Sequence, residues 1–559
     1  MMMRQVLTLV FSCVAVLLMG QGAKPAKYWV SFKDKIGTPY STDQPEAFLS
    51  PRALERRFRH GIEVTEEDLP VNPAYVRKLT EQGAKLHNVS KWLNAAAVLA
   101  DSMVVDKLMG LPFVDSVEYV GPHIRQRVRT RTKNKKRDQW EDYKRLPSYY
   151  GYGAPQIQML SGDLLHDKGH RGRHMLVAVL DGGFTNVDIM PFFDSLRQDE
   201  RLLQGRDFVG VDKHVWESSS HGSHVLSVMG SNLPGLLVGT APDASYVCIK
   251  TEDTGGEYLI EECNWVAGAE YADSIGADVV NSSLGYTTFN DKSMNYTFED
   301  LNGRKSRATQ AANIAFSKGM IMVNSAGNSG RGPWKYIGVP SDAEKVLTVG
   351  ATDFTGRRAS FSSFGPSSDG RVKPDVATAG QAVTVASIYS YDVQLSNGTS
   401  FSSPMMAGMV ASLWSAFPNK TNEDIVAAIR KCGNQATRPD DELGYGIPDF
   451  FKAYLYLELG QLTTEVLRTN RLQLYPVYRG EDSQLYLHLA SEGKFSYTIT
   501  DLAGKQLVHR TFEGQKGDIL TEGLPDLPAG SYLMTVFDGE QLAHQLLHVP
   551  EKEEGMIIP

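Results

Sequence analysis

The sequence predicts an α/β protein with a mainly parallel, doubly wound sheet, preceded by a small α+β domain and followed by an all-β domain. Between about residues 149 and 460, short apolar runs alternate with helical stretches, as in strands joined by crossover helices. The order β-α-β-β-α-β at 28–120 indicates a ferredoxin-like unit. From 472 to 549, glycines separate short strand-like runs, which favours a β-sandwich.

Composition bounds the class of protein. The chain has 559 residues, which suggests roughly three to four domains. Its hydrophobic content of 42% and charged content of 22% are typical of a globular, core-forming protein. A net charge of −8 gives no reason to expect nucleic acid as a partner.

The N-terminus has the pattern of a signal peptide. Arg4 supplies a positive charge, an apolar stretch runs from Val6 to Met19, and small residues follow up to Ala23. This stretch is shorter than a typical membrane-spanning helix. We therefore expect residues 1–23 to direct export, and the protein to be secreted or held at the cell surface.

Residues 24–122 form the predicted α+β domain. Strands are expected at Tyr28–Phe32 and Val114–Val120, helices at Pro73–Gly83 and Met103–Met109, and two short apolar stretches lie within 86–99. The segment 123–148 then carries a run of basic residues: Arg125, Arg127, Arg129, Arg131, Lys133, Lys135, Lys136 and Arg137. Like-charge runs are usually solvated, and such segments are readily cut by proteases. We expect a linker that contains a maturation site.

The central domain, 149–460, holds the clearest alternation. The strands expected are Met175–Leu180, Tyr246–Ile249, Asp278–Val280, Met320–Val323 and Val346–Val349. The helices expected are Glu261–Ile275, Thr309–Lys318, Ser402–Phe417 and Asn422–Lys431.

The C-terminal domain, 468–550, reads as a β-sandwich. The strands expected are Leu472–Tyr475, Leu485–Leu489, Phe495–Asp501, Gln506–Thr511 and Ser531–Phe537. Outside the signal segment the cysteines are Cys248, Cys263 and Cys432. One disulfide with a free thiol, or three buried thiols, are both compatible with that odd number.

One serine stands at a chemically favourable place. Gly398-Thr399-Ser400 has the character of a tight turn, and the apolar residues that follow, from Met405 to Phe417, recur at helical spacing. Pro404 suits the first turn of such a helix. Ser400 is then expected at a helix N-terminus, where free N–H groups and the helix dipole favour a developing oxyanion. The simpler alternative is that Ser400 is an N-cap.

Polar segments follow three of the predicted strands. These are Asp181-Gly182-Gly183, Asn281 to Gly285, and Asn324 to Gly330. The carboxyl ends of parallel strands meet at one edge of a sheet, where ligands bind. Turns alone could explain any one of these segments, because Asp, Asn and Gly dominate turns. Three together favour a functional site.

A base is available in His221. With Asp181 and Ser400 it completes an acid, a base and a nucleophile. The histidines His214, His221 and His224 suggest a zinc site as an alternative. Gly222 and Ser223 stand where a metalloprotease motif has its glutamate, which weakens that alternative.

Together these segments resemble the subtilisin-like serine peptidases (subtilases). The resemblance covers about 149 to 456, and Asp181, His221 and Ser400 follow the chain order of subtilisin. Ser223 stands where the family usually has threonine. The matching segments are Val179 to Gly183, His221 to Val225, Gly239 to Pro242, Ser283 to Gly285, Ala326 to Asn328, Arg358 to Ser362 and Gly398 to Pro404.

The resemblance implies the roles of the site residues. Ser400 would be the nucleophile, His221 the general base, Asp181 the residue that orients it, and Asn328 an oxyanion donor. The substrate-binding residues it implies line the two sides of a cleft for an extended peptide: Ser283, Leu284, Gly285, Ser325, Ala326 and Gly327. Partners would be protein or peptide substrates. A non-enzymatic binding protein on an inactive protease scaffold is the alternative, and the intact residue set argues against it.

The resemblance extends to the flanking domains. Residues 24–122 resemble a subtilase propeptide, which acts as the enzyme's own inhibitor. Residues 468–550 resemble a type IX secretion sorting domain, through Asp501 to Lys505 and Leu527 to Tyr532. This implies outer-membrane secretion machinery as a partner, and an Ig-like accessory domain is the alternative. The chemistry needs no cofactor, and a structural calcium has family precedent but no EF-hand-like loop here.

Overall fold

The computed structural model describes residues 24–123, 145–210, 214–390, 392–466, 473–477, 483–489, 491–515, 518–537 and 542–549. The expected signal peptide and most of the basic linker lie outside these residues. The chain divides into two compact units, Met1–Phe450 and Phe451–Pro559. Among the described helices, none combines the length and apolar character that a membrane span requires.

The N-terminal domain is a four-stranded antiparallel sheet with the order β2-β3-β1-β4. Its elements follow the expected order and are β1 (Ala26–Phe32), α3 (Pro73–Glu81), β2 (Lys85–Ser90), β3 (Ala95–Ala100), α4 (Ser102–Met109) and β4 (Val114–Pro122). Val30, Leu79, Val98 and Leu108 are buried in its core.

An insertion between β1 and α3 was not anticipated. It contains η1 (Pro45–Ala47), α2 (Pro51–His60) and η2 (Glu66–Asp68). Helix α2 is well delimited, because the Ser50 side chain accepts from Ala53 N, Pro51 stands at N1, and Gly61 ends it at φ 65°. Its many arginines give it a polar composition, so apolar periodicity did not reveal it.

The central sheet has seven strands in the order β13-β12-β11-β10-β5-β9-β6, and every pairing in it is parallel. The strands are β5 (Leu176–Asp181), β6 (Leu202–Asp207), β9 (Ser245–Lys250), β10 (Val279–Ser282), β11 (Ile321–Ser325), β12 (Leu347–Thr352) and β13 (Val376–Ala379). β5 and β12 are buried throughout, as strands covered on both faces must be. The sequence analysis missed β6, a partly exposed edge strand, and β13, a short run of small residues.

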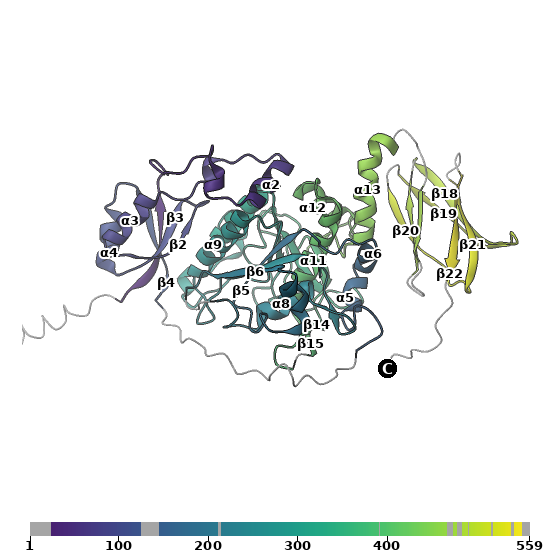
Figure 1. The fold of residues 1–559 in the computed structure, drawn as a ribbon, viewed down its shortest axis with the longest axis horizontal. Coiled ribbons are helices and arrows are strands. Elements are labelled where there is room, and N and C mark those ends of the chain that lie inside the picture. Colours follow the sequence, from purple (N-terminus) through teal and green to yellow (C-terminus); the bar gives the residue numbers. More distant parts are fainter. Residues whose placement is uncertain are drawn as a thin grey trace, which may run out of the picture. The chain divides into compact units, whose positions relative to one another are not determined.

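Helices cover the sheet, and Figure 1 shows α8, α9 and α11 around it. α9 (Ile260–Ile275) and α10 (Arg307–Ser317) pack together and share a core with strand residues such as Ala178 and Leu180. The alternate residues Val177 and Val179 point to the opposite face. α8 (His221–Gly230) and α11 (Thr399–Ala416) pack on each other, and α12 (Asn422–Lys431) contacts α11.

Shorter elements connect these parts. They are α5 (Ala154–Gln158), α6 (Gly162–Asp167), η4 (Pro191–Phe193), α7 (Asp194–Gln198), β7 (Asn232–Leu233), β8 (Leu237–Val238), η5 (Lys292–Met294), η6 (Phe298–Asp300), β14 (Val383–Ala386) and β15 (Val393–Ser396). Cys248, Cys263 and Cys432 are buried thiols, the second of the two arrangements expected from the sequence.

Helix α11 begins earlier than expected. The sequence predicted a start at Ser402, with Pro404 in the first turn, but the helix begins at Thr399 and Pro404 lies inside it. The error arose because Thr, Ser and Gly around Ser400 were interpreted as a turn. Gly398, at φ 149°, supplies the special backbone conformation just before the helix.

The C-terminal unit consists of α13 (Phe450–Val466), which begins at the border of the two units, and seven strands among the described residues. β16 (Gln473–Val477), β17 (Gln484–His488) and β20 (Ile519–Gly523) form one antiparallel sheet. β18 (Gly493–Asp501), β19 (Gln506–Gly514), β21 (Gly530–Phe537) and β22 (Leu542–Val549) form another. Leu485, Leu487, Tyr497 and Met534 join both sheets in one core.

The packing of α11 predicts the effect of one substitution. A Cβ at Gly408 would stand 1.9 Å from Thr240 Oγ1, so Gly408→Ala should overpack the contact between α11 and the Thr240 segment. We expect a loss of about 1–3 kcal/mol in stability. It should appear as a lower thermal unfolding midpoint of the full chain. Gly110→Ala, whose Cβ would meet its nearest neighbour at 3.4 Å, is the control. Equal midpoints for the two variants would contradict this packing.

Candidate active site

Three adjacent strands deliver the predicted polar residues to one edge of the sheet. In the order β11-β10-β5, Ser325 ends β11, Ser282 ends β10 and Asp181 ends β5. Ser283 follows β10 directly and Asn328 follows β11 by three residues. Because the strands are parallel, these side chains converge at the carboxyl edge.

Asp181 is buried and bonded to His221. The aspartate is 1% exposed, its Oδ1 accepts from Gly182 N at 2.7 Å, and its Oδ2 lies 2.8 Å from His221 Nδ1. His221 is the first residue of α8, and its backbone N–H donates to Ser219 Oγ at 3.1 Å. Burial lowers the pKa of His221, but the charge and hydrogen bond of Asp181 outweigh burial and raise that pKa above its ordinary value.

Ser400 is the second residue of α11 and is 8% exposed. Its backbone carbonyl accepts from Ser283 Oγ at 3.0 Å. Pro404 has no N–H to reach that carbonyl four residues earlier, so Ser283 replaces the missing helical bond. The Ser400 hydroxyl in turn donates to the Ser283 carbonyl at 3.5 Å. The interior proline thus ties the helix that carries Ser400 to the end of β10.

His221 and Ser400 come from neighbouring helices. The His221 ring and the ring of Phe401, the residue after Ser400, have centroids 6.1 Å apart. α8 and α11 pack on each other. The imidazole and the start of α11 are therefore brought together, with the imidazole's Nδ1 engaged by Asp181.

Asn328 is held by the start of α11. Its Oδ1 accepts from Thr399 N at 2.9 Å and from Thr399 Oγ1 at 3.1 Å. A Cβ built on Gly398 would lie 3.7 Å from Asn328 Nδ2. The carbonyl end of the amide is thus fixed, and its NH₂ is oriented as a donor near the segment that precedes Ser400. The sequence analysis did not assign a role to Thr399, although it lies within the Ser400 motif.

The predicted cleft walls are well supported by hydrogen bonds. Asn324 Nδ2 donates to the Leu284 carbonyl at 3.0 Å and joins the two walls. Gly327 N donates to Thr399 Oγ1 at 3.1 Å, and Ala326 N donates to the Val349 carbonyl at 3.0 Å. Gly285 is exposed and Leu284 is partly buried. These segments lie at the same strand ends as Asp181 and Asn328.

The proposed zinc ligands do not assemble. His221 is bonded to Asp181, while His214 Nε2 lies 3.6 Å from Glu217 Oε1. Burial first, and then the neighbouring His221, lower the pKa of His224 to about 4. In the part of the chain that the structure describes, the group close enough to share a metal ion is another one, Glu252, Glu257 and Glu261.

Those three glutamates are the residues that could hold a cation. Their carboxylate oxygens lie within 4.8 Å of one another, and the Tyr286 hydroxyl donates to Glu252 at 2.7 Å. Burial raises all three pKa values, and neighbouring carboxylates raise those of Glu252 and Glu261 further. Oxygen ligands suit Ca²⁺ rather than Zn²⁺, and three are about half of a Ca²⁺ shell. No ligand spacing marks them in the sequence, only a local excess of acids.

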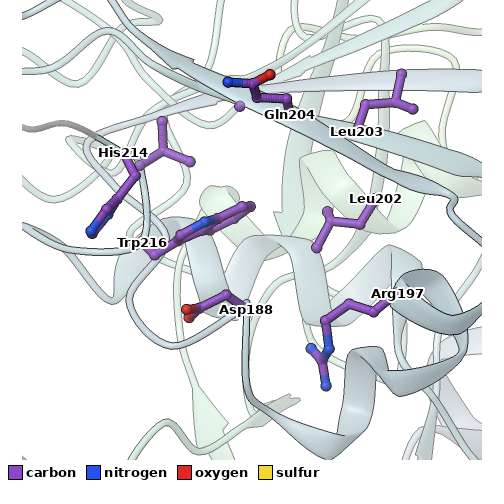
Figure 2. A pocket seen from close by; sticks show the side chains of 9 residues that line it. Asp188, Arg197, Leu202, Leu203, Gln204, His214 and Trp216 are labelled. Atoms are coloured by element: carbon purple, nitrogen blue, oxygen red, sulfur yellow. The ribbon is translucent and has the colours of Figure 1, made fainter.

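A pocket of about 360 Å³ lies outside this constellation. Figure 2 shows its lining, including Asp188, Arg197, His214 and Trp216. The residues predicted for the site are not part of that lining. The site is therefore defined by the strand ends and the start of α11, and not by this pocket.

Comparisons with known proteins agree with this geometry. Residues 172–446 match the subtilase family, and residues 27–139 match the peptidase S8 propeptide domain of Bacteroidota. Subtilisin of Bacillus pumilus is 30% identical over 279 residues, 49% of this chain and 88% of that protein. Subtilisin DY of Bacillus licheniformis is 29% identical and covers 53% of this chain and 94% of the relative. Subtilisin E of Bacillus subtilis (strain 168) is 29% identical, and the match covers 62% of this chain and 77% of that protein.

The matched family region contains Asp181, His221, Asn328 and Ser400, and the propeptide region contains β1 to β4 and the insertion with α2. The chain therefore belongs to the subtilase family, as a subtilisin-like serine endopeptidase that carries an N-terminal propeptide.

Proposed function

We propose that this protein is a secreted serine endopeptidase, made as a self-inhibited precursor, in which Ser400, His221 and Asp181 form the catalytic triad. The observation that carries the proposal is the bond of 2.8 Å between Asp181 and His221, next to the start of a helix that bears Ser400. An acid that is 1% exposed and a His with a raised pKa suit general base catalysis.

The mechanism follows from these positions. Ser400 Oγ attacks the scissile carbonyl carbon while His221 Nε2 takes the hydroxyl proton. Asp181 accepts the Nδ1–H, keeps the imidazole in the productive tautomer and stabilises the imidazolium. His221 then returns the proton to the leaving amine, which leaves an acyl-enzyme on Ser400. Water, activated by His221, releases the acid product and restores the serine.

Two hydrogen-bond donors close to the start of α11 hold the oxyanion. Asn328 Nδ2 and the Ser400 backbone N–H are the donors, and the helix dipole adds to their effect. The backbone N–H and the hydroxyl of Thr399 both donate to Asn328 Oδ1, so the side-chain amide cannot flip without losing two hydrogen bonds. An extended substrate adds as a strand between Ser283–Gly285 and Ser325–Gly327, which makes protein and peptide substrates the natural partners.

The flanking segments support export and latency. Residues 1–23 have the pattern of a signal peptide, residues 24–122 act as the chain's own inhibitor, and the basic linker 123–148 contains the maturation site. Residues 468–550 form an accessory β-sandwich that presents the chain to outer-membrane secretion machinery. The single core shared by its two sheets supports a compact accessory domain.

No cofactor is needed for this chemistry, because the triad supplies the nucleophile and base, and Asn328 Nδ2 with the Ser400 backbone N–H supplies the oxyanion donors. A structural Ca²⁺ is the ion that Glu252, Glu257 and Glu261 suit best. The zinc-hydrolase alternative has no assembled ligand set among the described residues. The alternative of an inactive scaffold is disfavoured because all of the catalytic residue types are in place.

The first prediction concerns the nucleophile. Ser400→Ala should accumulate as uncut precursor, and a fluorophosphonate probe should label Ser400 of the mature parent but not the variant. Precursor length by gel and the labelled peptide by mass spectrometry are the measurements. Ser402→Ala, two residues along α11, is the control and should still be labelled. A mature parent that takes no label would rule out an active nucleophile.

The second prediction concerns pH. The base must be neutral, so kcat/KM should rise with pH along an acid limb whose midpoint reports the His221 pKa. Because Asp181 raises that pKa, the midpoint should lie above the ordinary value of about 6.5. Asp181→Asn should move the midpoint to lower pH, since burial then acts without the carboxylate. It should also lower kcat, by about 10⁴-fold. An acid limb that stays at the same pH would contradict the role of Asp181.

The third prediction concerns the oxyanion. Asn328→Ala should lower kcat by roughly 10²–10³-fold, a range that comes from subtilisin itself, with KM little changed. Thr399→Val, which removes only one of the two groups that orient the amide, should have a smaller effect. Steady-state kinetics on a peptide substrate distinguish them. A large rise in KM with constant kcat would indicate substrate binding instead.

A further inference from the structure

Residues 33–72, between β1 and α3, form an insertion that we call the arm. The arm carries α2, and the arginines of α2 bond to the catalytic domain. Arg56 and Arg57 are 0% and 1% exposed, which is rare for arginine and requires partners. The partners lie about 220 residues further along the chain.

The arm binds the C-terminal end of α9 through hydrogen bonds and an ion pair. Arg52 Nε donates to the Gly276 carbonyl at 2.9 Å, Arg52 Nη2 bonds to Asp278, and Arg56 bonds to the Ala277 carbonyl. These carbonyls follow the last turn of α9, where the helix dipole favours cations. α2 also reaches α11, since the His60 and Trp414 rings lie 5.7 Å apart.

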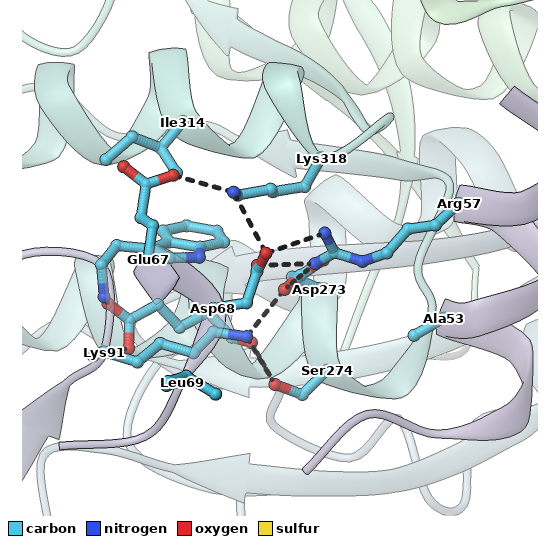
Figure 3. Close-up of polar contacts among 12 residues, drawn as sticks. Ala53, Arg57, Glu67, Asp68, Leu69, Lys91, Asp273, Ser274, Ile314 and Lys318 are labelled. Carbon is cyan, nitrogen blue, oxygen red and sulfur yellow. Dashed lines mark hydrogen bonds and ion pairs between the residues drawn. The ribbon is translucent and has the colours of Figure 1, made fainter. Parts of the chain in front are cut away.

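Asp273, in the last turn of α9, is the centre of the contact. Its carboxylate lies 2.6 Å from Arg56 Nη2, 2.9 Å from Arg57 Nη2 and 2.7 Å from Lys91 Nζ. Figure 3 shows Arg57 and Lys91 converging on this aspartate. Burial acts to raise the Asp273 pKa, and the three cations overcome burial and lower the pKa to about 2. All three cations belong to the propeptide.

In the same cluster, the catalytic domain also supplies a cation that pairs with anions of the arm. Lys318, from the catalytic domain, lies 2.8 Å from Glu67 and 3.3 Å from Asp68 of the arm. Arg57 also bonds to Asp68 at 3.0 Å, so Asp68 links the two halves (Figure 3). The catalytic domain thus offers two buried anions, Asp273 and Asp278, and one buried cation, Lys318, and the arm supplies an oppositely charged partner to each. This arrangement of charges favours the observed position of the arm over a shifted one, in which like charges would meet.

The propeptide meets α9 at its other end as well. Gly121, in β4, packs close to the side chains of Tyr258 and Ile260, where α9 begins. Between the ends, Glu270 accepts from Lys91 N at 2.8 Å and Trp92 N at 3.0 Å. α9 has 16 residues and is therefore about 24 Å long. β4, which leads into the basic linker, and the arm are separate attachment points along one helix.

We propose that the arm is a second anchor, centred on Asp273, that keeps the propeptide bound to the catalytic domain after the linker is cut. Two attachments on one rigid helix give the detached end a high local concentration, so β4 rebinds whenever it leaves. The propeptide therefore stays bound when the linker is cut, and its release requires the arm to dissociate from α9. The inference rests on the proposed function only in treating the bound propeptide as the inhibitor.

The test measures binding and not catalysis. The full chain carries Ser400→Ala and a site for a sequence-specific protease inserted in the basic linker, and it is cut after folding. The two fragments of the parent should co-elute on size exclusion. Asp273→Asn removes the carboxylate charge that Arg56, Arg57 and Lys91 share, and should raise the dissociation constant at least ~30-fold, the equivalent of about 2 kcal/mol for a truncated buried charge pair. Arg56→Met, on the propeptide side, should also weaken binding.

The matched control is Asp199→Asn, the same chemical change at an exposed aspartate whose ion pair with Arg201 lies within the catalytic domain. It should leave the dissociation constant unchanged. If Asp273→Asn and Arg56→Met both bind within threefold of the parent, the arm is not an anchor and the proposal fails. Because the readout is fragment binding, a failure here is distinct from a failure of the Ser400 predictions.

A second measurement needs no substitution in the interface. Amide hydrogen exchange of the cut Ser400→Ala parent should show α2 as protected as in the uncut chain, and at least as protected as β4. An α2 that exchanges freely after the cut, while β4 remains protected, would overturn the proposal. This keeps the test decisive even where an interface variant does not fold.

Discussion

The site depends on the burial of helix α11. Every residue from Thr399 to Trp414 is buried, so the helix cannot rotate or slide without opening the core. Its start is held from two sides: Asn328 bonds to Thr399, and Ser283 bonds to the Ser400 carbonyl. The carbonyl is available because Pro404 lacks an N–H. A residue that would weaken an ordinary helix here connects the nucleophile to the neighbouring strand end.

Electrostatics at the strand ends follow from burial. Asp181 is buried, and its carboxylate is held by two hydrogen bonds, from Gly182 N and with His221 Nδ1. On the adjoining segment, Glu252, Glu257 and Glu261 face one another with raised pKa values. The two groups of carboxylates differ in their partners: Asp181 has a hydrogen-bonded imidazole, whereas Glu252 and Glu261 have other carboxylates beside them.

The ends of the buried strands were easier to predict from the sequence than the segments around them. Asp181, Ser283 and Asn328 were placed correctly at one edge because long apolar runs identify parallel strands, and the ends of such strands converge. β6 and β13 were missed because an edge strand and a strand of small residues lack that signal. The arm was missed because the buried residues of α2 are Ala53, Arg56 and Arg57, and arginine does not normally mark the buried face of a helix. The start of α11 was misplaced because capping residues and turn residues are the same types.

The ionic character of the arm's interface fits an inhibitor that must eventually leave. An apolar interface would expose a hydrophobic patch on the mature enzyme, with a tendency to aggregate. Asp273, Asp278 and Lys318 are charged side chains, which water solvates well when an interface opens. The same solvation weakens binding, since each buried charge must give up water when the arm docks. Only a nearly complete set of partners offsets that loss, which explains why Asp273 has three cations and Asp68 has two. Arg57 is shared by Asp273 and Asp68, so the loss of one contact weakens both ends of the set, and release of the arm should be cooperative rather than gradual.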